Sequence, residues 1–309
     1  MKKLSFALAL ACIFGLGLSL KAQSAAAAAQ PAPKQITTED DADGFVPEVS
    51  IELDWRTKYV SKGKIINPDH NVAVDVYVSL KGFYFDLWSP IDMTSQNDGY
   101  KPAKYLRNGS GYMNKRKFRA EEVDYSLGYE YTIDADTLGG FSPLNIDFNY
   151  TYYQYPRYRE IGENRYFSHF HEVPLTLTVK LKDVLTSIKD KDDPVSLAIG
   201  GQWYYDIENF WWYGNFFADL GYDIDENLSV GLKNTWYWAD RDYCGHGTNT
   251  LTAIELKPSI TYKITKQISV GAYVAGAYFA SHKVRKDMRE SESQHNATWW
   301  GGVKFGFSF

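Results

Sequence analysis

The sequence has 309 residues, a formal net charge of −5 and an aromatic content of 16%. This mildly acidic balance, without a long basic patch, argues against a nucleic-acid partner. Beyond the first twenty residues, no stretch approaches the roughly 18 to 20 continuous apolar residues that a transmembrane helix requires. If the chain crosses a membrane, it therefore does so with strands.

The N-terminal region has the pattern of a targeting segment. Lys2 and Lys3 precede an apolar run from Leu4 to Leu20, and small residues follow it. This arrangement is typical of a secretory signal peptide, which we assign to residues 1–22. Cleavage within the following alanine run fits equally well. Residues 23–46 are rich in Ala and Pro, then acidic, and we interpret them as a flexible periplasmic leader.

Strand periodicity begins at Val49. Apolar and polar residues alternate from Val49 to Tyr59 and again from Val72 to Leu80. A tight Lys81-Gly82 turn then leads into a third alternating segment, Phe83 to Trp88. A long polar loop follows, from about residue 92 to 117.

The segment from Asp54 to Asp92 resembles the opening of Gcw_chp, a family of bacterial outer-membrane proteins regarded as porins but without an assigned function. The shared features are an aromatic strand, a Lys-Gly pair, a Pro-containing turn, an alternating strand and a Gly-Phe-Tyr strand that ends near Trp. In this sequence they are Tyr59-Val60, Lys62-Gly63, Pro68, Val72 to Leu80, Gly82-Phe83-Tyr84 and Trp88. The resemblance implies a β-barrel and no particular solute.

The remaining chain repeats the alternation. Further strands are predicted within residues 123–133, 144–152, 173–181, 195–205, 216–224, 228–238, 254–264, 268–281 and 297–309. Tight links at 225–227 and 265–267 fit periplasmic turns, whereas the 182–193 link is long for one and could hold a helical turn. We predict an all-β protein, a transmembrane up-and-down antiparallel β-barrel of about twelve strands over residues 47–309.

The last strand gives the clearest indication of lipid. Its apolar face ends in Phe305, Phe307 and Phe309, whereas the opposite face is small, polar or cationic. Transmembrane strands alternate in this way, whereas an edge strand of a sandwich would press its apolar face against a second sheet. The strand resembles the signal that the barrel-insertion machinery reads. We therefore expect an outer-membrane location, in contact with lipid and lipopolysaccharide.

The predicted inward faces carry charges of both signs. The lumen-lining residues that we predict are Glu52, Asp54, Arg56, Lys58, Asp75, Asp86, Asp124, Glu130, Asp147, Lys180, Asp219, Asp223, Lys233, Glu255, Lys257, Lys263 and Lys304. A water-filled lumen keeps such charges solvated, whereas a dry interior would require them to pair. The favoured function is passive diffusion of small hydrophilic solutes through this mixed-charge lumen. The alternatives are a non-conducting structural or surface-interaction barrel and, third, an outer-membrane lipid hydrolase.

Residues suited to catalysis or metal binding are few. Ser168, His169 and His171 gather near an outer strand end, but their order lacks the His-x-Ser pair of outer-membrane lipid hydrolases, so we expect no enzyme. We expect no metal site at the two histidines, because strand alternation turns Glu172 away from both. Cys244 and His246 alone do not make a metal site, and we expect no cofactor.

Overall fold

The computed structural model describes residues 46–61, 64–67, 69–93, 119–120, 122–138, 142–154, 169–181, 194–208, 210–239, 250–280 and 296–309. The predicted signal peptide, the leader up to residue 45 and the 182–193 link lie outside the described residues. Among the described residues, no helix is long and apolar enough to cross a membrane.

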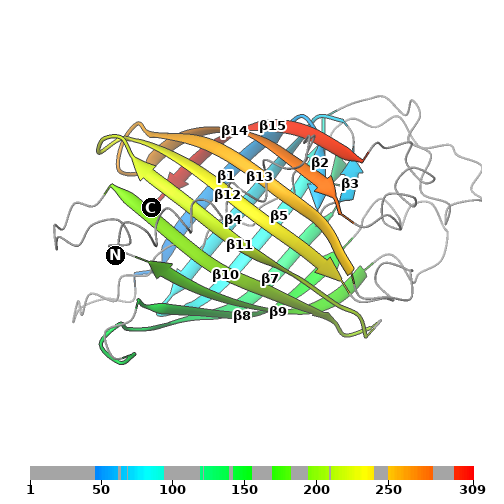
Figure 1. The fold of residues 1–309 in the computed structure, drawn as a ribbon, viewed down its shortest axis with the longest axis horizontal. Helices are drawn as coiled ribbons and strands as arrows, with labels where there is room; N and C mark the ends of the chain where they lie inside the picture. The colour runs from blue at the N-terminus through cyan, green and yellow to red at the C-terminus, as the bar shows by residue number, and fades with distance from the viewer. Residues whose placement is uncertain are drawn as a thin grey trace, which may run out of the picture.

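Twelve long strands of the described chain form a closed antiparallel barrel (Figure 1). They are β1 (Glu48–Arg56), β4 (Asn71–Leu80), β5 (Phe83–Asp92), β7 (Val123–Ile133), β8 (Leu144–Gln154), β9 (His169–Leu181), β10 (Val195–Asp206), β11 (Trp212–Asp223), β12 (Leu228–Ala239), β13 (Thr250–Lys263), β14 (Ile268–Phe279) and β15 (Ala297–Ser308). The short β6 (Arg119–Ala120) pairs with the end of β5. The predicted fold class and strand number are confirmed.

The first and last strands close the cylinder. β1 pairs with β15 from Ser50 opposite Ser308 to Arg56 opposite Gly302. The backbone N–H of Phe309 also donates to the carbonyl of Val49 at 2.9 Å. Every long strand thus has a partner on both sides, and the barrel exposes no long unpaired edge.

The two faces of the wall differ in polarity. Large apolar side chains point outward and are exposed, among them Leu127 at 64%, Phe148 at 54% and Val274 at 55%. Inward positions hold buried polar groups, such as Asp75 at 5% and Glu255 at 1%. A water-soluble domain has the opposite distribution, with apolar side chains inside and charges outside.

Short turns gather at the end of the barrel where the C-terminus lies (Figure 1). Lys81 and Gly82 take φ of 51° and 86°, the positive values that a two-residue hairpin turn requires. In the next short turn, Oδ1 of Asp225 accepts a bond of 2.9 Å from the N–H of Leu228. Oγ1 of Thr265 accepts one of 3.0 Å from the N–H of Ile268 in the third.

A small hairpin occupies the opposite mouth of the barrel. It consists of β2 (Tyr59–Ser61) and β3 (Lys64–Asn67), which pair only with each other in the described chain. The predicted continuous strand to Tyr59 is therefore wrong, because β1 ends at Arg56. Val60, 1% exposed, packs with the inward side chains of Tyr273 and Phe279. The hairpin consequently narrows the mouth.

Candidate functional site

Two cavities lie inside the barrel. The terminal cavity, about 420 Å³, lies toward the C-terminal end and reaches Ser50 and Ser308. The hairpin cavity, about 150 Å³, lies beneath the hairpin and reaches Tyr59 and Ser61. Six residues line both cavities, and we call them the central ring: Asp86, Ser126, Thr176, Gln202, Asp219 and Lys233. The cavities therefore adjoin at this ring.

Carboxylates predominate on one group of neighbouring strands inside the barrel and lysines on another, although Asp219 on β11 and Glu255 on β13 lie beside the lysines. The acidic wall, formed by the neighbouring strands β4, β5, β7 and β8, comprises Asp75, Asp86, Asp124, Glu130 and Asp147. The lysine wall, formed by β12, β13 and β15, comprises Lys233, Lys257 and Lys304. In the closed strand order, β12 is six positions from β5 in either direction. Asp86 on β5 and Lys233 on β12 therefore face each other across the lumen.

Several predicted residues meet in pairs. Nζ of Lys304 donates to Oε1 of Glu52, and Nε of Arg56 donates to Oδ2 of Asp54 at 2.9 Å. The Arg56 guanidinium also lies 5.3 Å from the Trp88 ring, a cation–π arrangement. Asp219 and Lys233 are register partners on β11 and β12. These charges belong to local networks on the wall.

Tyrosine hydroxyl groups hold other inward carboxylates. Tyr84 donates to Oδ1 of Asp147 at 2.7 Å, and Tyr237 donates to Oε2 of Glu255 at 2.6 Å. Such bonds fix both partners against the wall and give each carboxylate an uncharged donor. The lumen is lined by positioned polar groups, with charges and phenols interleaved.

Five predicted lumen residues line neither cavity: Asp54 and Arg56, which pair with each other, and Lys58, Asp223 and Lys263. Asp223 and Lys263 occupy exposed strand ends at the C-terminal rim. Lys58 follows the end of β1, and its Nζ donates to Oγ1 of Thr298 at 3.1 Å. Lys180 lines the hairpin cavity.

The three phenylalanines of the predicted insertion signal lie on the outer face. Phe305 is 44% exposed, Phe309 is 74% exposed and Phe307 is half-buried.

Three further polar residues face the interior without having been predicted there: Glu172, Glu122 and Gln202. Glu172 is 1% exposed and accepts a hydrogen bond from Tyr213 inside the barrel. Extending the predicted strand, 173–181, upstream by one residue would have placed it inward by alternation. Glu122 precedes β7, where no periodic pattern reaches it. Gln202 has the inward parity of β10 but no charge to draw attention to it.

The outer face carries one cluster suited to a metal ion among the described residues: His169, His171 and Glu208. Both histidines belong to β9, and Glu208 follows β10. Glu172, the neighbouring carboxylate in sequence, faces the lumen instead. Ser168, the nucleophile that a hydrolase would need, lies outside the described residues.

Comparisons with known proteins give low similarities. No family model matches the sequence, and no curated protein matches it significantly. A KdgM porin structure is 9% identical over 85% of this chain and 99% of its own, with a TM-score of 0.43. A NanC porin structure is 11% identical over 84% and 98%, with a TM-score of 0.44. LpxR from Salmonella typhimurium is 9% identical over 84% and 99%, also with a TM-score of 0.44. The fold assignment therefore rests on the strand pairing of this chain.

Proposed function

We propose that the protein spans the bacterial outer membrane as a narrow channel for passive diffusion of small hydrophilic solutes. The observation that carries this proposal is that two cavities, each lined by several charged and hydroxyl side chains, meet at the central ring. The twelve strands leave room between opposite walls, and many of the side chains that face this room are charged or carry a hydroxyl or amide group. A solute that keeps part of its hydration shell meets polar groups at each level.

Unsatisfied polar atoms support a water-filled lumen. Within the described residues, one oxygen atom each of Asp75, Asp86, Thr178, Asn215 and Thr235 is buried without a hydrogen-bond partner. All five residues line the cavities. Leaving such a group dry costs about 1–3 kcal/mol, so water is the partner that these positions favour.

The outer surface supports the membrane location. Exposed aromatic and aliphatic side chains cover strands from β5 to β15, as expected of a wall in contact with acyl chains. The resemblance of residues 54–92 to the Gcw_chp porins points the same way, as do the proposed signal peptide and the aromatic terminal strand. We propose that the barrel-insertion machinery delivers the protein to this membrane.

The wall charges suggest a preference for cations. Nine carboxylate side chains line the cavities: Glu52, Asp75, Asp86, Glu122, Asp124, Glu130, Asp147, Asp219 and Glu255. Four lysines line them: Lys180, Lys233, Lys257 and Lys304. The excess of acid raises the local concentration of cations. The opposed acidic and lysine walls also favour solutes that carry both charges, because such a solute can align across the lumen.

One observation favours the alternative of a non-conducting barrel. The hairpin enters the mouth, where Val60 joins a buried cluster and Tyr59 is 2% exposed. A hairpin fixed in this way could close the outer path. Of the two functions, the channel agrees better with the unsatisfied lumen atoms, because a plugged interior would be expected to pair them.

Conductance of the purified protein in planar bilayers tests the proposal. The wild type is compared with a variant in which a short Gly-Ser linker replaces residues 59–67. We expect small conductance steps from the wild type and larger steps from the variant. If neither protein gives conductance steps although circular dichroism shows an intact barrel, the channel is rejected in favour of the non-conducting structural barrel. Release of fatty acid from phospholipid that is lost in His169→Ala and His171→Ala would instead support the hydrolase.

A further inference from the structure

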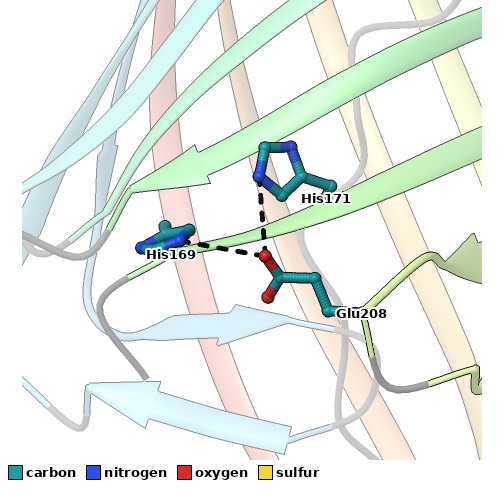
Figure 2. Close-up of side chains that lie close together, drawn as sticks. All are labelled: His169, His171 and Glu208. Atoms are coloured by element: carbon teal, nitrogen blue, oxygen red, sulfur yellow. Dashed lines mark ion pairs between the residues drawn. The ribbon is translucent and has the colours of Figure 1, made fainter. Parts of the chain in front are cut away.

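A cluster of three metal-ligating groups lies on the outer face of the barrel, away from the lumen. Figure 2 shows the rings of His169 and His171 both directed toward one oxygen of the Glu208 carboxylate. Oε1 of Glu208 is 3.8 Å from Nε2 of His169 and 3.6 Å from Nε2 of His171. One ligand atom from each residue lies within 4.8 Å of the others. One strand, β9, and the turn after β10 thus bring three donors close together.

Backbone pairing fixes the spacing of these donors. His169 and His171 are two residues apart on β9, so strand alternation places both on its outer face. The N–H of Ile207 donates to the carbonyl of His171 at 3.0 Å, which holds the β10–β11 turn against β9. The N–H of Glu208 donates to Oδ1 of Asp206 at 2.9 Å. Glu208 is therefore held beside the histidines by main-chain contacts.

Tyrosines from β8 orient the imidazole rings. Oη of Tyr150 is hydrogen-bonded to Nδ1 of His171. The Tyr152 ring centroid lies 5.0 Å from that of His171 and 6.1 Å from that of His169. When Nδ1–H of His171 donates to Tyr150, Nε2 keeps a free lone pair that points toward Glu208. Metal-bound histidines commonly donate their second ring nitrogen in this way.

The types of the three ligand groups and the distances between their ligand atoms indicate which metal ion they suit. Ligand atoms about 2.0–2.2 Å from a tetrahedral zinc ion lie roughly 3.4 Å apart. The two histidine–carboxylate separations need to close by only a few tenths of an ångström to reach this value. Two imidazoles and one carboxylate suit zinc, whereas calcium and magnesium prefer shells of oxygen. Three protein ligands leave a fourth position for water.

We propose that His169, His171 and Glu208 bind one zinc ion on the outer rim of the barrel. The ion ties β9 to the turn after β10 and leaves one coordination position open to the exterior. The side chains of His169, His171 and Glu208 are 42%, 29% and 38% exposed, so a metal ion can reach them from solvent. The same three groups without metal form an ion pair whenever a histidine is protonated, and this is the competing role.

Isothermal titration of the refolded protein with zinc chloride, near neutral pH in detergent micelles, tests the site. We expect the wild type to bind one zinc ion per barrel. The affinity for zinc should fall at least tenfold in Glu208→Gln and further in His171→Ala. Tyr150→Phe should weaken binding about tenfold, the usual effect of removing an orienting partner. Cobalt bound in place of zinc should show the visible absorption of a tetrahedral complex, which an ion pair cannot give.

Control variants separate this site from other ligands. The double variant Cys244→Ser with His246→Ala, which removes the donors of another loop, should bind zinc as the wild type does. Glu226→Gln, in a turn at the opposite end of the barrel, should also leave binding unchanged. Each variant is first shown to fold by its heat-modifiable migration on a gel. No binding to the wild type, or binding that survives both His171→Ala and Glu208→Gln, overturns the proposal.

Discussion

Tyr59 donates a hydrogen bond of 2.5 Å from Oη to Oε2 of Glu122. Tyr59 belongs to the inward hairpin and Glu122 immediately precedes β7, so this bond ties the hairpin to the barrel wall. Burial, together with the nearby Glu122 carboxylate, raises the pKa of Tyr59 well above its ordinary value. The phenol therefore remains a donor at neutral and mildly alkaline pH, and the hairpin stays attached to the wall.

Removing this hydroxyl group should loosen the hairpin. Tyr59→Phe keeps the ring but takes a donor from a carboxylate that is 6% exposed. We expect the free energy of unfolding to fall by about 1–3 kcal/mol, and single-channel conductance and current noise to rise. Urea titration and bilayer recording measure these effects. The control is Tyr131→Phe, whose ring is 54% exposed; equal behaviour of the two variants would mean that packing alone holds the hairpin.

The same bond sets an expected pH dependence. Because the folded-state pKa of Tyr59 is raised, its contribution to stability is complete below the ordinary tyrosine pKa of about 10. It is lost as the pH rises from that value through the folded-state pKa. We expect wild-type current noise to increase only in strongly alkaline solution, and Tyr59→Phe to lack this increase. An increase that begins near neutrality in the wild type would assign the effect to another group.

The opposed wall charges should set ion selectivity in opposite directions. Asp86→Asn removes a negative charge from the central ring and should shift the reversal potential in a potassium chloride gradient toward anions. Lys233→Gln removes a positive charge from the facing strand and should shift it toward cations. Glu226→Gln, in an exposed turn, is the matched control. Shifts of the same sign from Asp86→Asn and Lys233→Gln would contradict this assignment, and the absence of a shift from either variant would show that neither charge faces the permeation path.

Gly302 provides room for an inward tyrosine. A Cβ at this position would lie 2.5 Å from Oη of Tyr273 and 2.7 Å from the backbone oxygen of Trp55. Oη of Tyr273 donates to Oδ1 of the buried Asp54 at 3.1 Å. We expect Gly302→Ala to displace Tyr273 and lower the free energy of unfolding by about 1–3 kcal/mol. Gly271→Ala, whose Cβ would meet its nearest atoms at 3.3 Å, is the control; a loss as large there would exclude a specific role for Tyr273.

The wall of the barrel could be predicted from the sequence because one physical rule applies to all its strands. An apolar outer face and a polar inner face impose a period of two, which can be read in each of the twelve long strands. Turn chemistry locates the links, as at Lys81-Gly82, where positive φ is needed. The hairpin could not be predicted, because alternation continues past Arg56 to Tyr59 without a turn signal. The chain leaves the wall there, and Val60 joins a buried cluster with inward residues of β12 to β15.

The outer cluster shows a second limit of periodicity. Alternation places His169 and His171 on one face and correctly turns Glu172 to the other. The third ligand that we propose, Glu208, comes from a turn whose conformation depends on Asp206 and on pairing with β9. A contact between a strand and a distant turn requires the register of β9 against β10. No local pattern specifies that register.

A substitution at Phe309 allows folding of the barrel and its insertion into the outer membrane to be tested separately. Its side chain is 74% exposed, whereas its backbone N–H closes the barrel by donating to Val49. Phe309→Ser keeps the backbone bond, so we expect unchanged refolding in detergent micelles. If the insertion machinery reads the terminal aromatic side chain, the amount of barrel in the outer membrane of growing cells should fall. Phe83→Ser, which removes another outward phenylalanine that is 66% exposed, is the control. An equal fall for both variants would assign the effect to lost lipid contact, because Phe83 lies outside the proposed insertion signal.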